Sequence, residues 1–306
     1  MTVPRTRPLK VGVLLPDSER ELNGHVPHWR DIVTMARAAE DVGFDSIWIT
    51  DHLIHREPGK PKQGMWECWS LLAALAAVTE RVEIGPLVSC VGFRNPALLA
   101  KIADTVDEIS GGRLILGLGA GWHEPEYRAF GYPFDHRVAR FAEALTIITG
   151  LLREGQVDFA GTYYQARDCE LRPRGPRPLG PPIMIGSTGP RMMALAARHA
   201  DLWNAWGRNT PVDVAPASAT LDAACHGVGR DPATLARSVA VLVDLPGRRG
   251  RPREKGPFLS GSPEELADNL RGLARAGVSH VQVVLDPNTP SGIEELAAVL
   301  EILDRG

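Results

Sequence analysis

The amino-acid sequence predicts an α/β fold, a (β/α)8 TIM barrel with insertions. Short apolar runs alternate with amphipathic helical patterns along the chain, and eight such strand-then-helix units can be counted. Strands separated by helices pair in parallel, and eight of them favour a closed barrel over an open, doubly wound sheet, which is the alternative fold. The length of 306 residues fits one such domain, residues 1–306, and no repeat or linker is visible.

The expected strands are apolar runs of five to seven residues, too short for core helices. They lie at 10–15, 46–50, 82–88, 113–119, 182–186, 202–206, 238–244 and 280–285. Helical spacing of apolar residues predicts helices at 29–42, 67–79, 97–110, 138–152, 190–199, 212–227 and 262–276, and a last helix at the C-terminal end. The stretch 155–181, which is rich in Pro, Gly and Tyr, is expected to be irregular.

Two of these helices carry clear end signals. The helix 97–110 has apolar residues at spacings of three, four and three, and Gly111 stops it. In the helix 262–276, Ser262 provides a hydroxyl cap, Pro263 suits the first turn, and Glu265 can reach back to the cap. Local chemistry and apolar spacing therefore agree on where these helices lie.

Composition excludes several classes of partner. Hydrophobic residues make up 44% and charged residues 23% of the chain, as in an ordinary globular protein, and the net charge of −3 argues against nucleic acid. The one basic run, 247–255, is expected to be a solvated loop. Four cysteines without C-x-x-C spacing predict reduced thiols and no zinc site. The longest apolar run, 71–78, is too short for a membrane span, so a cytoplasmic protein is expected.

The stretch "LGLGAGWHEPE" (116–126) ends a predicted strand with three glycines. The dinucleotide-binding fingerprint needs a sixth-position glycine where this chain has Trp122, and Pro125, Gly131 and Pro133 predict that no helix opens there. What remains is bare backbone against which a flat ring or a polar tail could pack. Glycines for a tight turn are the structural alternative.

A second stretch at a strand end suits a phosphate. It consists of Gly186, Ser187, Thr188, Gly189, Pro190 and Arg191, which lead directly into a predicted helix. Free N–H groups of the first helical turn, two hydroxyls and a guanidinium would converge there. A plain helix cap is the alternative.

The stretch "TDHLIHRE" (50–57) places acidic, imidazole and guanidinium groups at the end of the second strand. We interpret His52 as a group that gives or takes a proton, with Asp51 orienting it. A structural histidine that caps the strand is the alternative. A metal site built from His52 and His55 is not expected, because the H-x-H pattern of barrel metallohydrolases is absent.

With these motifs placed, the sequence resembles the bacterial luciferase-like oxidoreductases over nearly its whole length. The matching signatures are "GFDSIWITDH" (43–52), the stretch 95–134 that includes "GAGW" and "EYRAFG", and "GSTGPRMMALAARHADLWNAW" (186–206). Within that family the pattern is similar to the branch that uses coenzyme F420, a 5-deazaflavin. The family's sugar-phosphate dehydrogenases have a tryptophan four residues after the strand-two histidine and a glutamate after the strand-four glycines. This chain has Arg56 and Trp122 at those positions, so neither their substrate nor their acid–base pair is carried over.

The resemblance implies a cofactor ring across the barrel mouth, against a non-proline cis peptide that would fall at Leu87–Val88. It also implies a cofactor phosphate between the strand-four loop and the segment 186–191. The implied cofactor-binding residues are Asp51, His52, Leu87, Val88, Gly119, Ala120, Gly121, Trp122, Gly186, Ser187, Thr188, Gly189, Pro190 and Arg191. The loop 246–260 is expected to close over the site or to steer an acidic cofactor tail.

The expected function is hydride transfer between coenzyme F420 and a small organic substrate, with His52 and Asp51 as the catalytic residues. One alternative is a two-component monooxygenase that receives reduced FMN from a partner flavin reductase. Another is a flavin-binding protein without catalysis, against which the retained Asp51-His52 pair argues. The resemblance also implies a homodimer.

Overall fold

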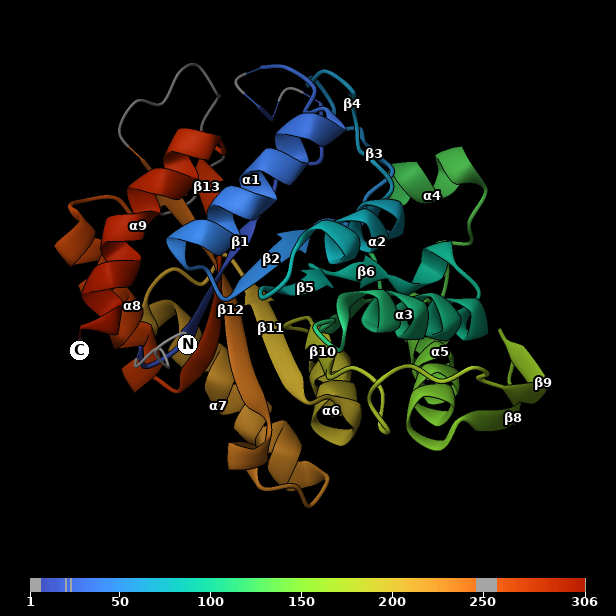
Figure 1. The fold of residues 1–306 in the computed structure, drawn as a ribbon. Coiled ribbons are helices and arrows are strands. Elements are labelled where there is room, and N and C mark those ends of the chain that lie inside the picture. The colour runs from blue at the N-terminus through green and yellow to red at the C-terminus, as the bar shows by residue number, and fades with distance from the viewer. Residues whose placement is uncertain (1–6, 20, 23, 246–257, 306) are drawn as a thin grey trace.

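The barrel predicted by strand counting is present in the computed structural model, which describes residues 7–19, 21–22, 24–245 and 258–305. Its nine-stranded parallel sheet has the order β5-β2-β1-β13-β12-β11-β10-β7-β6 (Figure 1). The strands are β1 Lys10–Leu14, β2 Ser46–Ile49, β5 Glu83–Pro86, β6 Ser89–Cys90, β7 Leu116–Gly119, β10 Ile183–Gly186, β11 Leu202–Trp206, β12 Ala236–Asp244 and β13 Val278–Asp286. All eight predicted strands are confirmed; the third, predicted at 82–88, corresponds to β5, and the short strand β6 follows that range.

The two edges of the sheet meet, so that the barrel is nearly closed. Ile84 of β5 forms a parallel bridge with Leu114, just before β7. The Ile84 amide donates a hydrogen bond to the Arg113 carbonyl at 3.0 Å, and the Ile115 amide donates to the Ile84 carbonyl at 2.8 Å. Closure of this kind requires parallel strands that share one tilt, as in a TIM barrel.

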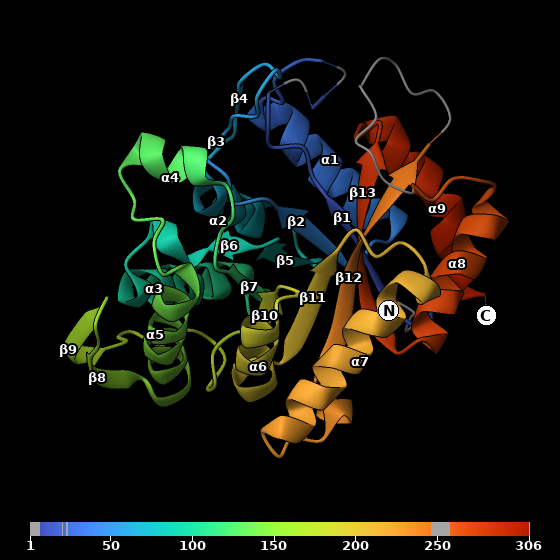
Figure 2. The ribbon, with the colours of Figure 1, turned by 180° about the vertical axis from the view of Figure 1, so that it is seen from behind.

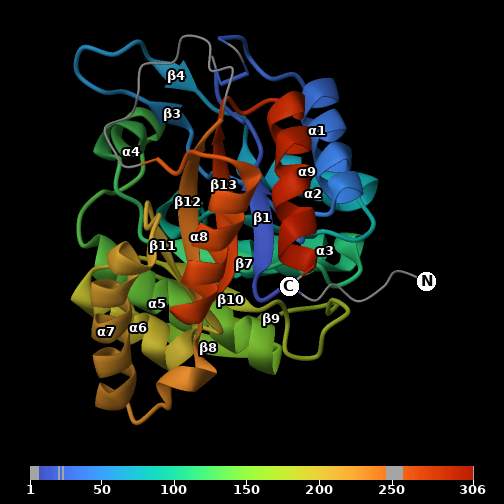
Figure 3. The same ribbon diagram turned by 90° about the vertical axis from the view of Figure 1, so that its left-hand side faces the viewer.

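The predicted helices surround the barrel (Figures 1 and 3). They are α1 Trp29–Val42, α2 Cys68–Val78, α3 Pro96–Ser110, α5 Arg137–Thr149, α6 Pro190–His199, α7 Pro211–Gly227, α8 Pro263–Arg275 and α9 Pro290–Asp304. The capping box expected at Ser262 and Glu265 is present at the start of α8. Gly111 ends α3 in the left-handed conformation, with φ of 67°.

One prediction about a helix was wrong. A seven-residue helix, α4 (Glu124–Phe130), follows the strand-four loop, whereas the sequence predicts that Pro125, Gly131 and Pro133 prevent one. Pro125 lies in its first turn, where the amide has no partner within the helix, so a proline there costs nothing. Gly131 ends the helix with φ of 78°. These residues therefore bound a short helix.

Two short hairpins were also not predicted. The segment 155–181, expected to be irregular, contains β8 (Gln156–Ala160) paired with β9 (Gln165–Glu170). The loop after β2 contains β3 (Ile54–His55) paired with β4 (Gln63–Gly64). Figure 2 shows α4 beside this second hairpin, at the end of the barrel toward which the strand arrows point. Both elements therefore lie at the mouth of the barrel.

Alternation along the strands separates two cores. Most buried residues lie between strands and helices, whereas a smaller cluster fills the barrel interior: Leu14, Trp48, Leu87, Ile115, Met184 and Ala240. No helix in the described part of the chain is long and apolar enough to cross a membrane. The basic run 247–255, and residues 246–257 of the loop expected to close over the site, lie outside the described residues.

Candidate active site at the barrel mouth

The mouth of the barrel has an interrupted third strand, as the family resemblance implied. The Leu87–Val88 peptide bond is cis and lies between β5, which ends at Pro86, and β6, which begins at Ser89. Leu87 belongs to the cluster inside the barrel, and the partly buried Val88 packs against the same cluster. These two residues therefore lie at the break in the third strand and pack on the interior of the barrel.

The glycines around the interruption make room for Val88. A Cβ atom on Gly119 would lie 2.6 Å from Val88 Cγ2, and one on Gly186 would lie 2.9 Å from Val88 Cγ1. A Cβ on Gly117 would lie 3.2 Å from the same methyl group. Sequence reasoning had assigned these glycines to bare backbone beside a cofactor. In the structure, the side chain that they accommodate belongs to the protein itself.

Gly121 accommodates a second buried side chain. Its φ is 75°, and an added Cβ would overlap the Tyr127 hydroxyl and lie 2.7 Å from Cys90 Sγ. The Tyr127 hydroxyl lies 2.8 Å from that sulfur and donates to the Ala120 carbonyl at 3.1 Å. Burial raises the pKa of Cys90 to about 12 and raises the pKa of Tyr127 as well. Both groups are therefore protonated at neutral pH and hold the strand-four loop in place.

Asp51 lies at the end of β2 with a fully buried side chain, but it does not orient His52. Its carboxylate accepts hydrogen bonds from Ser89 Oγ (2.9 Å), from the Cys90 amide (2.9 Å) and from two Arg94 nitrogens (2.6 and 3.0 Å). Arg94 also contacts Glu67, the N-cap of α2. The expected pairing with His52 was wrong, and Asp51 instead ties the ends of two strands to a helix.

The carboxylate that contacts His52 is Glu126, which sequence reasoning had not selected. Glu126 Oε1 lies 2.9 Å from His52 Nδ1, and Glu126 Oε2 accepts the Leu53 amide at 2.9 Å. The residue is 1% exposed and comes from α4. The stretch 116–126 contains this carboxylate. Because the sequence predicts no helix there, it gives no reason to expect that Glu126 turns back toward His52.

Three further rings surround His52. Its ring lies 5.2 Å from that of His55 and 5.6 Å from the indole of Trp122, both edge to face, and His55 stacks on His123 at 4.6 Å. Burial, together with the neighbouring imidazoles, lowers the pKa of His55, and burial lowers that of His123. Both are neutral at pH 7, so these rings form an aromatic wall beside His52. Among the described residues, no group of three or more His, Cys, Asp and Glu side chains could hold a metal ion.

The segment 186–191 begins at the last residue of β10, which pairs with β7, the strand that leads into the glycine-rich loop. Ser187 is fixed by its backbone, which donates to the Asn204 carbonyl and accepts from the Trp203 indole. Helix α6 begins after Gly189, and no side chain caps its first turn. Arg191 is exposed, and within the described ranges it forms no ion pair. The amides and this guanidinium could together bind an anion.

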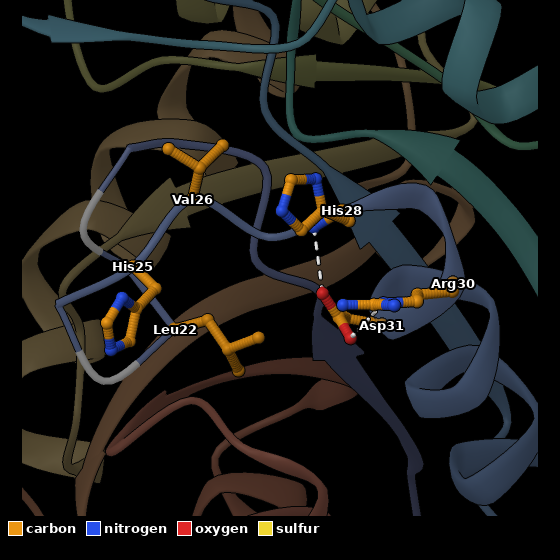
Figure 4. Close-up of a pocket in the computed structure, with 6 residues that line it drawn as sticks. All are labelled: Leu22, His25, Val26, His28, Arg30 and Asp31. Atoms are coloured by element: carbon orange, nitrogen blue, oxygen red, sulfur yellow. Dashed lines mark hydrogen bonds and ion pairs between the residues drawn. The ribbon is translucent and has the colours of Figure 1, made fainter.

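A hollow lies away from these residues, and Figure 4 shows its lining. Its volume is about 620 Å³, and it is lined by Leu22, His25, Val26, His28, Arg30 and Asp31, from the loop after β1 and the start of α1. The dashed line marks the His28 amide donating to Asp31 at 2.9 Å. None of the predicted site residues lines it, so the candidate active site remains the mouth around His52.

Comparison with known sequences identifies the family of this chain. The family described as luciferase-like monooxygenase matches residues 9–245. Pyrimidine monooxygenase RutA of Cronobacter turicensis is 32% identical over 240 residues, which cover 73% of this chain and 62% of the relative. The chain therefore spans less than two thirds of that relative. The 5,10-methylenetetrahydromethanopterin reductase of Archaeoglobus fulgidus is 32% identical over 257 residues, covering 82% and 72% of the two chains.

Comparison of structures gives the same fold. An F420-dependent secondary alcohol dehydrogenase, solved in complex with an F420-acetone adduct, superposes with a TM-score of 0.79 over 95% of this chain and 99% of that chain. The two sequences are 18% identical, so the likeness shows a shared barrel and nothing about ligands.

Proposed function

We propose that this chain, which belongs to the luciferase-like monooxygenase family, transfers a hydride between coenzyme F420 and a small organic substrate at the mouth of its barrel. The observation that carries the proposal is a partly exposed imidazole, His52, held by the buried carboxylate of Glu126 at the open end of the barrel. An imidazole in that position can exchange a proton with a substrate while a hydride moves to or from its carbon.

The residues at the mouth fit a planar, phosphate-bearing cofactor. A Cβ atom on Gly119 or Gly186 would meet Val88, so these two glycines keep Val88 in its place at the break in the third strand. The pair Leu87–Val88 would support the ring from below, and the loop 119–122 would form one wall. The uncapped start of α6 and Arg191 would bind the phosphate. A bound deazaflavin would supply the hydride-carrying carbon.

The protein's own residues then have three tasks. His52 gives or takes the proton through the ring nitrogen that faces away from Glu126. The rings of Trp122, His55 and His123 limit the access of water on that side of His52. Asp51 and Arg94 hold the strand ends, so that the imidazole keeps its place relative to the mouth.

The deciding experiment is a titration of the purified protein with coenzyme F420 and, separately, with reduced FMN. Saturable binding of F420 is expected, and tight binding of reduced FMN with none of the deazaflavin would overturn the proposal. Once turnover is detected, His52→Ala is expected to lower kcat by about 10²-fold or more, since general acid–base groups contribute that much. The matched control is His226→Ala, an exposed imidazole in the last turn of α7.

The second candidate is a two-component monooxygenase that uses reduced FMN from a flavin reductase. The observation that favours it is the match to pyrimidine monooxygenases. Oxygen-dependent product formation that requires a reductase would select it. A flavin-binding protein without catalysis would bind a cofactor but lose nothing when His52 is replaced. For each candidate we propose a homodimer in the cytoplasm, where four unpaired thiols would stay reduced.

A further inference from the structure

We propose that Glu126 is a positioning residue: it keeps the proton of the neutral His52 ring on Nδ1 and so leaves Nε2 as the atom that exchanges a proton with the substrate. The inference rests on the proposed function in one respect, namely that His52 is the group that exchanges the proton. It concerns a residue 74 positions away in the chain, on a helix that the sequence did not predict.

The carboxylate of Glu126 binds two adjacent residues, His52 and Leu53. One oxygen lies 2.9 Å from His52 Nδ1 and the other accepts the Leu53 amide at 2.9 Å. Both bonds therefore end on adjacent residues at the end of β2. Because the carboxylate is 1% exposed, water does not compete for either oxygen. Glu126 thus fixes the backbone of this segment and its catalytic ring together.

The proton between Glu126 and His52 can be assigned from the donors present. A backbone amide can only donate, so Oε2 acts as an acceptor, and the proton between Glu126 and His52 lies between Oε1 and Nδ1. Because a carboxyl group is a stronger acid than an imidazolium, that proton belongs on Nδ1. A neutral imidazole with that proton carries its lone pair on Nε2, where it can accept a proton from a substrate.

The ring is also restrained from turning. Trp122 and His55 contact it edge to face, with interplanar angles of 79° and 73°. A half-turn of the ring would place a carbon against the carboxylate and would lose a charge-assisted hydrogen bond in a buried site. Nε2 therefore has one stable direction relative to the barrel.

Other charged groups near this ring do not replace Glu126. Asp51 is bound by Arg94, and the other imidazoles, His55 and His123, have pKa values lowered by burial and are neutral at pH 7. Glu57 faces His55 and Lys60. In the described part of the chain, Glu126 is the carboxylate within hydrogen-bond distance of His52.

The sharpest test is Glu126→Gln, which keeps the shape and removes the charge. If the carbonyl oxygen of the new glutamine still accepts the hydrogen bond from the Leu53 amide, its NH2 group faces Nδ1 and donates to it. The ring proton must then move to Nε2. Two-bond proton–nitrogen spectra of the cofactor-free protein distinguish the two tautomers, and His52→Gln assigns the signal. Glu124→Gln, an exposed carboxylate on the same helix that contacts Arg128, is the matched control.

The expected result has two parts. The wild type and Glu124→Gln show the proton on Nδ1, and Glu126→Gln shows it on Nε2. With turnover measured, Glu126→Gln lowers kcat by about 10²-fold or more with KM little changed, because the base is lost while binding is retained. Glu126→Asp keeps an acceptor for Nδ1, so it retains the wild-type tautomer and a kcat above that of Glu126→Gln.

The outcomes separate this inference from the proposed function. A proton on Nε2 in the wild type, or an unchanged tautomer in Glu126→Gln, overturns it. The inference is also overturned if kcat falls only in proportion to Tm in Glu126→Gln and Glu126→Asp, because Glu126 would then have a purely structural role. Failure to bind F420 contradicts the proposed cofactor and leaves the tautomer measurement as it stands.

Discussion

Replacement of Asp51 by Asn distinguishes the role that the structure gives this carboxylate from the one that its place in the sequence suggested. The side chain is fully buried and accepts four hydrogen bonds, from Ser89, from Cys90 and twice from Arg94. An amide has one acceptor oxygen, and its NH2 group would face a donor. The substitution should therefore destabilise the fold at the junction of two strand ends.

The magnitude follows from these contacts. Removal of one partner from a buried ion pair costs about 3–5 kcal/mol, because the other charge stays buried. Arg94 keeps an ion pair with Glu67, whose side chain is 43% exposed, so we expect the lower end, about 3 kcal/mol. For a chain of this size, whose unfolding entropy is about 0.6 kcal/mol/K, that corresponds to a fall in Tm of roughly 5 °C.

The assay is thermal unfolding followed by tryptophan fluorescence and circular dichroism. Glu67→Gln is the control, because it removes the exposed partner of the same arginine and should cost less than about 1 kcal/mol. The reasoning is refuted if Asp51→Asn unfolds within about 2 °C of the wild type while its activity falls as far as that of His52→Ala. That pattern would return Asp51 to the role of orienting His52.

Three more predictions concern other parts of the barrel. Gly121→Ala should lower stability by about 2 kcal/mol or more, measured as Tm, because its Cβ would overlap the Tyr127 hydroxyl at a positive φ. Stability should fall as the pH drops from about 6.5 toward 3, because burial lowers the pKa of His280 to about 3, so the unfolded chain binds the extra proton in that window. Denaturant midpoints measured against pH should show a flatter slope for His280→Gln. Arg191→Glu should weaken binding of the phosphate-bearing cofactor by about tenfold or more with Tm unchanged, in the titration described above.

Each of the three has a control and a contrary result. Gly131→Ala shares the positive φ but meets nothing within 4 Å, so an equal loss in both variants would show that the space beside Gly121 is unimportant. An identical pH slope in His280→Gln and the wild type would remove that histidine from the acid response. Arg198→Glu, in the last turn of α6, should leave cofactor binding unchanged. An equal loss of binding in that variant would show that Arg191 acts only through the overall charge of the protein and does not contact the phosphate.

Much of the fold could be predicted because its signals are local. All eight strands and eight surrounding helices follow from runs and spacings within a dozen or so residues. The cis bond at Leu87–Val88 was located only through the family resemblance, since the local residues carry no proline at that bond. The strands of the hairpin β3–β4 are two residues long, too short for any periodicity. The hairpin β8–β9 was missed although Val157 and Phe159 alternate with polar residues in β8, because its partner β9 is mostly polar and the surrounding stretch is rich in Pro and Gly.

The candidate site could be predicted as a set of segments but not as a set of contacts. Asp51 and His52 are neighbours in sequence, yet the first faces Arg94 and the second faces Glu126. Successive residues at a strand end point in opposite directions, so neighbours in the chain join different networks. The sequence placed both near the mouth, and only the packing of α4 against the segment between β2 and β3 brought Glu126 to the imidazole.

The stretch 116–126 shows both sides of this division. By itself, the sequence determined that a strand ends here in glycines and that no dinucleotide loop follows, because strand periodicity and fingerprint spacing are local properties. Only the tertiary structure decided what the glycines are for: Gly119 makes room for Val88, and Gly121 makes room for Tyr127. The physical reason is that a missing Cβ is explained by the atoms that occupy its space, and those atoms come from elsewhere in the chain.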